Sequence, residues 1–441
     1  MAMVIKNNMS AINTLNILNR NQSSLAKSLQ KVSSGMKINN AGDGPSAYAI
    51  SERMRVQIRS LEQDNQNTQN GNSMMKTAEG AVSSTVELLK TLKEKAINAA
   101  NDTNTDEDRK IIQKEINQLV DQIDDNALVT YNGKYLVDGS KNMRGTATCT
   151  ALTNASLGTG TIWTSKLTEL KSRSGDDLNI QTNDSVTLSY VREGKTYTTT
   201  FTVGSKSLVS ILAESAFNGG VGVAGTDFVA TYGAGTTITL DKTGNTVFTL
   251  DNKNALTLRA TGTGTTYQVS SFTIAISDKD GNLRKTANNF LDAFKETLRA
   301  ENESENNTLT LHTGTRANQA IKVSMTDMRS LALGLKGTKG DVISVVSQER
   351  ANAAINAIET ALQKALDEQT SIGAVQTRLA YTSQNLTVSA ENVQNSESTI
   401  RDADMAKEMT EYTKNNVLLQ AAQSMLAQAN QNSSAILSLL Q

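Results

Sequence analysis

Four residue types are nearly absent from this chain of 441 residues, which has one cysteine, one histidine, one proline and one tryptophan. The single cysteine, Cys149, cannot form an intramolecular disulfide, so the chain is not a disulfide scaffold. One histidine and one cysteine also cannot supply a His–Cys metal cluster or the two-histidine zinc helix of a metallopeptidase. We therefore expect no metal site.

Catalytic motifs are equally scarce. A Ser-His-Asp triad or a Cys149–His312 dyad is formally possible, and either would have to use His312, the one histidine of the chain. No G-x-S-x-G nucleophile elbow accompanies it, and no Walker A loop is present to hold a nucleotide. We expect no catalytic residue, no cofactor and no enzymatic activity.

The charge balance gives no reason to expect a nucleic-acid or membrane partner. The formal net charge at pH 7 is −1, which creates no field that would attract phosphate groups. No stretch of about 18 or more apolar residues could span a membrane. The first 30 residues lack the apolar core of a secretory signal peptide, so an exported chain would use another route.

What the sequence has instead is apolar spacing typical of helices. The last 27 residues, 415–441, carry no Asp, Glu, Lys, Arg or His. Their apolar residues recur three, four or seven positions apart, which predicts a helix whose apolar stripe needs another helix to cover it. This stripe consists of Leu418, Ala422, Met425, Ala429, Ile436 and Leu440.

The opening segment, 4–36, has the same spacing and predicts an amphipathic helix. Breaker residues follow it, and Pro45 is placed to open the next helix at its first position. We expect Gly42, Gly44 and Pro45 to form a joint between two helical segments. The stripe of the opening helix includes Ile5, Ile12, Leu15, Leu25, Leu29 and Val32.

Two longer segments, 45–100 and about 341–400, keep a seven-residue apolar repeat, which predicts a coiled coil. The predicted seam contains Met54, Leu61, Met75, Val82 and Leu89 from the first segment, and Ile358, Ile372, Leu379, Leu386 and Val393 from the second.

Both seams become polar midway, for example at Asn65 and Ser383. Buried polar groups need hydrogen-bond partners. We therefore expect antiparallel packing, with Pro45 near Ser398, so that the polar layers of the two helices meet.

The remaining segments predict smaller elements. Thr105 and Asp108 form a capping box that opens a helix, and the Asn-Gly pair in 131–140 predicts a β-hairpin. Residues 141–302 hold 16 of the 28 glycines and include alternating stretches, of which 185–203 predicts a hairpin. A short helix over 287–298 and a hairpin over 308–325 follow. The fold class is mainly α: a long antiparallel coiled-coil rod with β-hairpins, a terminal helical hairpin and a β-rich insertion.

Several motifs at the two ends resemble those of bacterial flagellins. They are SSGMKINNAGDGPSAYAISERM (33–54), NGKYLVDGS (132–140), IGAVQTRL (372–379), STIRDADMAKEM (398–409), LLQAAQSMLAQANQ (418–431) and the closing ILSLLQ. The resemblance covers about 1–140 and 303–441. It implies a structural subunit that self-polymerises into the flagellar filament of motile bacteria.

The resemblance also implies three domains and a role for each. Residues 1–44 with 401–441 would form the inner domain, whose apolar stripes pack in the filament core. Residues 45–140 with 303–400 would form the rod, and 141–302 a variable outer domain.

By the same resemblance, the chain would be exported unfolded through the flagellar type III apparatus. An export chaperone would hold the tail, 405–441. Cap and hook-associated proteins would be further partners, and the extracellular flagellum the destination. The vertebrate Toll-like receptor five reads flagellins on the rod helix, which here implies contacts at Leu89, Lys93, Glu94 and Glu115, although Thr91 and Lys95 depart from the pattern.

Three other interpretations remain open at this point. A hook–filament junction protein shares similar terminal helices, but the closing motif favours flagellin. A flagellin with a zinc peptidase in its insertion needs a second histidine beside His312. A coiled-coil adhesin would be supported by an anchor or a signal, and neither is evident in the sequence.

Overall fold

The computed structural model describes residues 8–162, 164–213, 228–232, 237–243, 246–248 and 255–439. The chain divides into two compact units. The first contains Met1–Thr68, His312–Gln319 and Tyr381–Gln441, and the second contains Gln69–Leu311 and Ala320–Ala380. The two longest helices, α2 (Pro45–Ala100) and α7 (Gln348–Arg401), each contribute to both units.

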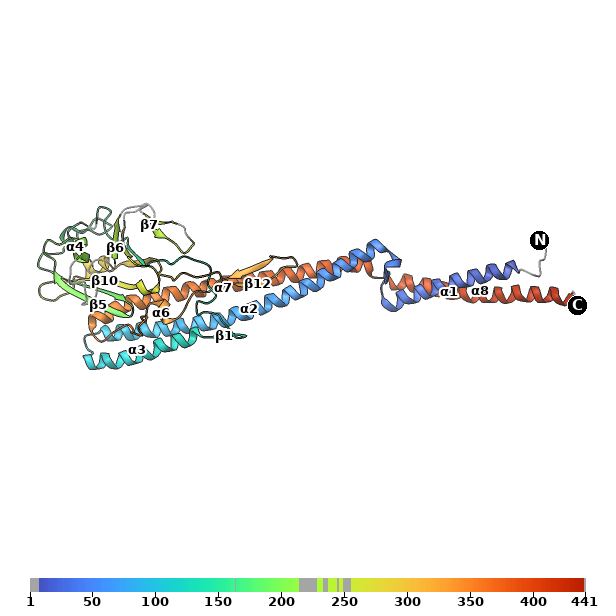
Figure 1. Ribbon diagram of the computed structural model, residues 1–441, viewed down its shortest axis with the longest axis horizontal. Coiled ribbons are helices and arrows are strands. Elements are labelled where there is room, and N and C mark those ends of the chain that lie inside the picture. The colour runs from blue at the N-terminus through green and yellow to red at the C-terminus, as the bar shows by residue number, and fades with distance from the viewer. Residues whose placement is uncertain are drawn as a thin grey trace. The chain divides into compact units, whose positions relative to one another are not determined.

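The first unit contains a pair of terminal helices. α1 (Met9–Ser34) and α8 (Met405–Leu439) lie side by side and run antiparallel (Figure 1). The Asn8 side chain accepts a hydrogen bond from the Ala11 backbone N–H and caps the start of α1, because the first N–H groups of a helix have no partner within it. This pairing confirms that each predicted terminal helix is covered by another helix.

The predicted joint after α1 is present, and it begins earlier than Gly42. α1 ends at Ser34, and the capping residue Gly35 has a φ of 71°, in the left-handed region that favours glycine. A 3₁₀ turn (Ala41–Asp43) follows, and Pro45 then opens α2 as predicted. The Lys37 N–H donates to the Arg401 carbonyl, and the Ala403 N–H donates to the Gly35 carbonyl. These bonds hold the segment after α1 beside the segment between α7 and α8.

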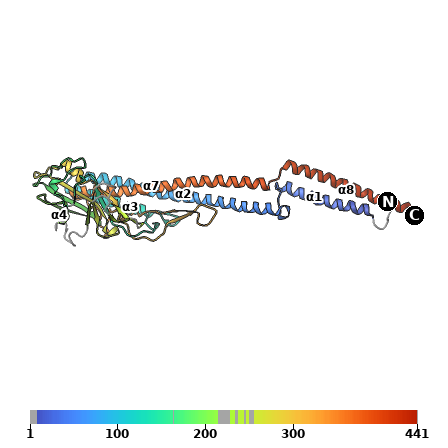
Figure 2. The ribbon, with the colours of Figure 1, turned by 90° about the horizontal axis from the view of Figure 1, so that it is seen from above.

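Contacts between α2 and α7 show an antiparallel pair within each unit (Figure 2). In the first unit, Arg55 Nε lies 3.6 Å from Glu397 Oε1. In the second, Lys93 Nζ lies 2.7 Å from Glu359 Oε2. The expected polar layer is confirmed, because Ser383 Oγ donates to Asn65 Oδ1 over 2.6 Å.

The register of this pair differs from the expectation that Pro45 lies near Ser398. Arg401, in the last turn of α7, donates to Glu52 Oε1 over 2.6 Å and lies over the Tyr48 ring. The observed register is therefore shifted by about two and a half helical turns. A heptad repeat favours shifts of seven residues, so these side-chain contacts, rather than the repeat, fix the register.

The start of α7 also differs from the sequence prediction, which placed it at about Asp341. α7 begins at Gln348, and the preceding residues are not helical. Ile343 and Val345 are fully buried in the core of the second unit. Gln113 bonds both their backbones, because its Nε2 donates to the Ile343 carbonyl and its Oε1 accepts from the Val345 N–H. These contacts replace helical hydrogen bonds.

Two predicted elements near the rod are confirmed. α3 (Asp106–Ala127) begins with the capping box formed by Thr105 and Asp108. β1 (Thr130–Tyr131) and β2 (Lys134–Tyr135) pair across an Asn132-Gly133 turn in which both residues have positive φ. Such a turn matches the twist of a two-residue hairpin.

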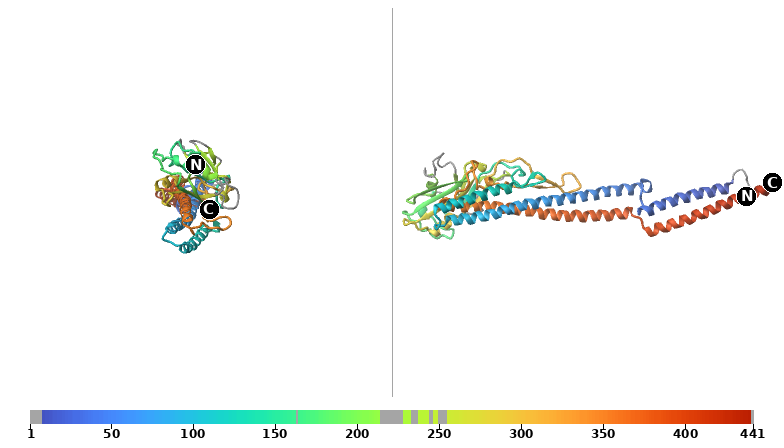
Figure 3. Two further views of the ribbon diagram at one scale, coloured as in Figure 1. Left: turned by 90° about the vertical axis from the view of Figure 1, so that its left-hand side faces the viewer. Right: turned by 90° about the horizontal axis from the view of Figure 1, so that it is seen from below.

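The insertion in the second unit contains two larger sheets. The first has the order β10-β4-β5, from Val269–Ser277, Ser185–Arg192 and Lys195–Thr202. The second has the order β11-β3-β9-β6, from Phe294–Leu298, Ala151–Asn154, Leu256–Ala260 and Phe228–Tyr232. Figure 3 shows these strands gathered beside α7. The predicted hairpin over 185–203 is therefore confirmed as β4 and β5.

Smaller elements complete the second unit. They are α4 (Leu208–Ala213), α5 (Lys285–Leu291), α6 (Ser330–Leu333), the pair β7 (Thr237–Leu240) and β8 (Thr246–Phe248), and short 3₁₀ turns at Leu167–Glu169 and Thr265–Tyr267. The helix expected over 287–298 is wrong in its second half, because β11 pairs there with β3. The hairpin expected over 308–325 is present as β12 (Leu309–His312) and β13 (Ala320–Val323).

The insertion is packed against the rod. Val191 of β4 belongs to the rod core, although most of the insertion has a core of its own. Ser270 and Ser271 of β10 donate buried hydrogen bonds to the carbonyls of Gly334 and Ala353. The division into separate rod and outer domains therefore stays a prediction, and the compact unit contains both.

The turn between β4 and β5 supplies a test of this packing. Gly194 has φ 73°, and a Cβ there would overlap the Asp341 carbonyl. We expect Gly194→Ala to lower the free energy of unfolding by about 2–3 kcal/mol, because backbone strain and a steric clash add. Gly204→Ala is the control, since Gly204 also has positive φ but faces open space. Equal losses in urea unfolding would contradict the predicted clash.

Candidate functional site

The two terminal helices pack on each other through a mixture of small, polar and half-buried apolar side chains. Ser28 and Ala422 are the buried residues of this pair among those whose side chains are described. Asn21 Nδ2 donates to the Leu418 carbonyl over 3.2 Å, and Asn415 Nδ2 donates to Ser28 Oγ over 3.0 Å. The seam therefore satisfies hydrogen bonds but buries little apolar area.

The large apolar side chains of the same helices lie on other faces and are exposed. On α1, Met9 is 61% exposed and Ile12 is 44% exposed. On α8, Val417 and Met425 are each 59% exposed. The whole exposed set is Met9, Ile12, Leu15, Ile17, Leu29, Met405, Met409, Val417, Leu418 and Met425. We call these ten residues the assembly surface. These uncovered apolar side chains make the paired helices a candidate surface for contacts with other chains.

The predicted packing residues of the terminal helices differ in their exposure within a single chain. Leu25, Val32, Ala422 and Ala429 are buried or half-buried, whereas Ile12, Leu15, Leu29, Leu418 and Met425 are exposed. The side chain of Ile436 is not described, and Ile5 and Leu440 lie outside the described residues. Their role in a filament core stays a prediction.

The predicted rod seam agrees closely with the observed burial. Met75, Val82, Leu89, Ile358, Ile372 and Leu379 are 2% exposed or less, and Leu61 and Leu386 are also buried. Met54 and Val393 are half-buried. Regular apolar spacing identified these residues because each of them covers the same side of its helix.

Arg401 is a site residue that the sequence analysis missed. Its guanidinium is buried at the joint, where it donates to Glu52 and lies over the Tyr48 ring. This hydrogen bond lowers the pKa of Glu52. Backbone N–H groups of Asn39 and Asn40 likewise lower the pKa of Asp43. Arg401 lies outside the heptad positions, so periodicity could not indicate it.

The structure corrects one of the contacts predicted for the innate receptor. Leu89 is fully buried in the core of the second unit, so it cannot contact a partner. Lys93 is half-buried and forms an ion pair with Glu359, and Lys95 forms one with Glu115 over 2.8 Å. Glu94 is exposed. Lys93, Glu94 and Glu115 remain the surface groups of this stretch.

Other kinds of site find little support in the part of the chain that the structure describes. It contains no cluster of three or more metal-ligating side chains. Within the same ranges, no helix has the length and apolar character needed to cross a membrane. His312 lies in β12 and Cys149 is buried elsewhere in the fold. The assembly surface is therefore the principal candidate site.

These features define the class of the protein. It is a coiled-coil structural protein whose paired terminal helices present an uncovered apolar surface. One family model, described as the bacterial flagellin N-terminal helical region, matches residues 5–142. Another, the bacterial flagellin C-terminal helical region, matches residues 355–440. The chain belongs to the bacterial flagellin family.

Relatives of similar length support this membership. A flagellin of Clostridium tyrobutyricum is 32% identical over 430 residues, which cover 97% of this chain and 99% of that protein. A flagellin of Bacillus subtilis (strain 168) is 28% identical and covers 99% of this chain and all of its own length. A flagellar filament 31.3 kDa core protein of Treponema maltophilum is 27% identical over the full length of both chains.

Solved structures are more distant. A flagellar hook associated protein-3 of Legionella pneumophila is 13% identical with a TM-score of 0.34, and the match covers 79% of this chain and 98% of that chain.

Proposed function

We propose that this chain is a structural subunit that polymerises into the bacterial flagellar filament, and that copies pack on one another through the assembly surface of α1 and α8. The observation that carries this proposal is that many large apolar side chains of α1 and α8 are exposed rather than buried between the two helices. Ser28 and Ala422 are the buried residues of their seam and Leu25 and Val32 are half-buried, while Met9, Ile12, Val417 and Met425 are exposed. Burial of such side chains between copies would supply the free energy of assembly.

The absence of charge from the tail fits the same role. In a polymer, each buried charge of one subunit recurs in every subunit, and an unpaired buried charge is costly. Amides such as Asn415 can instead bond to a neighbouring helix, as Asn415 does to Ser28 within the pair. The paired helices are thus suited to a crowded interior.

The proposed role as a filament subunit also implies partners in export and assembly. We propose that the chain is exported unfolded through the flagellar type III apparatus to form the extracellular flagellum, where cap and hook-associated proteins adjoin it. An export chaperone would cover α8 before assembly, because the contacts that order α8 come largely from α1. A helix with so little buried apolar area gains too little to offset its ordering entropy by itself.

Recognition by Toll-like receptor five is a further proposal for the rod helix. It involves Lys93, Glu94 and Glu115, since Leu89 is buried. Thr91 stands where the resemblance places an arginine, and a threonine cannot reproduce the bidentate contacts of a guanidinium. We expect weak agonism.

The proposed assembly surface is tested at Met425. We expect Met425→Lys to raise the protein concentration needed for filament growth at least about tenfold, because each copy would bury an unpaired ammonium. The soluble subunit should keep its helical circular dichroism, since Met425 is 59% exposed there. Met425→Leu is the matched control and should polymerise normally. Normal filaments from the lysine variant in electron micrographs would refute the assignment of this surface.

A further inference from the structure

The two ends of the insertion are joined at a short stem in the second unit. We call residues 137–145, 299–307 and 325–328 the stem. Backbone hydrogen bonds join its first two segments to each other. The third segment is held to the first, because the Met325 N–H donates to the Lys141 carbonyl over 3.1 Å and the Met328 N–H donates to the Val137 carbonyl over 2.9 Å. These two bonds therefore report whether the stem is closed.

Glu368 of α7 is bonded to the stem and is almost completely buried. It is 5% exposed, and its Oε2 accepts a hydrogen bond from Thr326 Oγ1 over 2.7 Å. Its Oε1 is also buried and has no hydrogen-bond partner in the part of the chain that the structure describes. Burial of an ionised carboxylate with an unpartnered oxygen is costly. A proton on Oε1 removes the charge and leaves Oε2 free to accept from Thr326.

The charged groups around Glu368 do not neutralise it, because each has a partner of its own. Lys364, one turn earlier on α7, lies with its ammonium 3.5 Å from Glu296 Oε1. Glu301 of the stem pairs with Lys242. The other charged groups of this region also form pairs, which are Arg299 with Asp367 and Arg329 with Asp327. Within the described ranges, Glu368 is left with Thr326 as its bonded neighbour.

This environment favours the protonated form of Glu368. Burial raises the pKa of Glu368 above its ordinary value of 4.5, and the negative charge of Glu301 adds to the rise. The hydrogen bonds from Thr326 and the charge of Lys242 lower the pKa but are outweighed. Opening of the stem would return the carboxyl group to water, where it ionises more readily. The closed stem therefore binds this proton more tightly than the open stem does, so rising pH favours opening.

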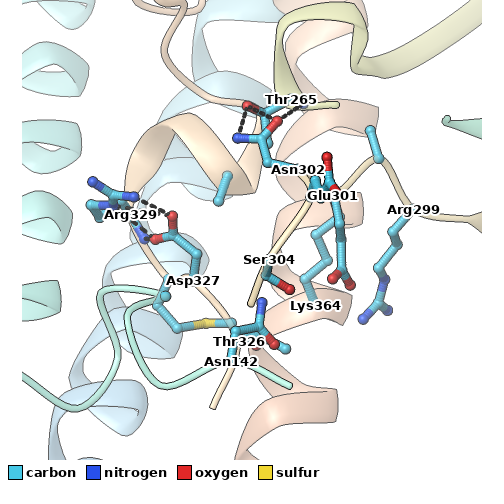
Figure 4. A pocket seen from close by; sticks show the side chains of 15 residues that line it. Asn142, Thr265, Arg299, Glu301, Asn302, Ser304, Thr326, Asp327, Arg329 and Lys364 are labelled. Atoms are coloured by element: carbon cyan, nitrogen blue, oxygen red, sulfur yellow. Dashed lines mark hydrogen bonds and ion pairs between the residues drawn. The ribbon is translucent and has the colours of Figure 1, made fainter. Parts of the chain in front are cut away.

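The contact between the stem and α7 is also loosely packed. A polar cavity of about 180 Å³ lies at this contact, and Glu301, Thr326 and Lys364 are among the residues that line it (Figure 4). Side chains around a cavity have fewer contacts to lose when two segments separate. The rod and the insertion each have a core of their own. Local opening of the stem therefore needs less free energy than unfolding of either core.

We propose that Glu368 is a proton-controlled clasp for the stem. With a proton on Oε1, the carboxyl group holds Thr326 and the stem stays closed on α7. Loss of that proton leaves a buried charge without a partner, and the stem opens to bring it into water. This regulation goes beyond the proposed structural role and does not depend on it, because the clasp and the stem lie in the second unit of one chain.

The test follows hydrogen exchange of the full-length soluble subunit by mass spectrometry from about pH 4.5 to about pH 7.5, with rates corrected for the intrinsic effect of pH. The reporters are the Met325 and Met328 amides. We expect their protection factors to fall by up to about tenfold per pH unit and then to level off, because opening releases one proton. Glu368→Gln keeps the shape of the side chain without its charge, so its protection should not change with pH.

Two further variants separate the clasp from general electrostatics. Glu359→Gln removes an exposed glutamate of α7 and should leave the pH dependence unchanged. Glu301→Gln should reduce the total loss of protection, because the charge of Glu301 raises the pKa of Glu368.

Three results would overturn the proposal. The first is protection of the Met325 and Met328 amides that stays constant with pH in the unmodified chain. The second is a fall of the same size in Glu368→Gln, which would assign the proton to another group. The third is an equal loss of protection in α3, which would show that the whole second unit loosens rather than the stem.

Discussion

Truncation of the chain after Ala406 is expected to abolish filament formation and to leave the second unit folded. The truncation removes nearly all of α8 (Met405–Leu439), so α1 loses the helix that covers its seam. The main hydrophobic core of the second unit contains no residue beyond Leu379. We expect no filaments in electron micrographs at about ten times the concentration at which the full chain polymerises, because assembly follows mass action.

A peptide of residues 405–441 gives the control for this truncation. Added to the truncated chain, it should restore helical circular dichroism in proportion to its concentration, because α1 and α8 are joined by contacts rather than by a shared loop. The thermal transition of the second unit should coincide in the truncated and full-length chains. Filaments from the truncated chain alone, or loss of that transition, would contradict the account of α8.

The coiled-coil seam could be predicted from the sequence because burial there follows one rule. Positions seven residues apart, such as Val82 and Leu89 or Ile372 and Leu379, face the same neighbour and are all buried. The turn at Asn132-Gly133 and the helix start at Thr105 were predictable for local reasons, since each depends on a few adjacent residues.

The faces of the terminal helices were not predictable in the same way. The sequence predicts Ile12 and Met425 as packing residues of a filament core, and in the single chain both are exposed. The seam uses Ser28 and Ala422, which let the backbones approach, and amide bonds that spacing does not reveal. A single chain buries only part of a pattern that serves many copies.

Long-range contacts explain the other differences. Arg401 fixes the register of α2 and α7, and Gln113 holds Ile343 and Val345 outside α7. Val191 of the insertion enters the rod core. Each of these contacts joins residues far apart in the chain, and neither local propensity nor apolar periodicity carries that information.

Replacement of Lys364 by methionine is expected to lower the free energy of unfolding of the second unit by about 3 kcal/mol. Lys364 and Glu296 are 7% and 8% exposed, and their ion pair joins α7 to β11 of the insertion. Loss of the ammonium leaves the Glu296 carboxylate buried. Arg299, whose Nε lies 3.4 Å from Glu296 Oε2, compensates in part, which places the loss at the lower end of the usual range. Urea unfolding measured by circular dichroism gives the change.

The double variant Lys364→Met with Glu296→Leu separates the charge from the packing. Apolar residues that replace both partners of a buried pair are often neutral or stabilising, so the double variant should recover at least half of the loss. A double variant as unstable as the single one would show that the side-chain volume of Lys364, rather than its charge, holds the insertion to the rod.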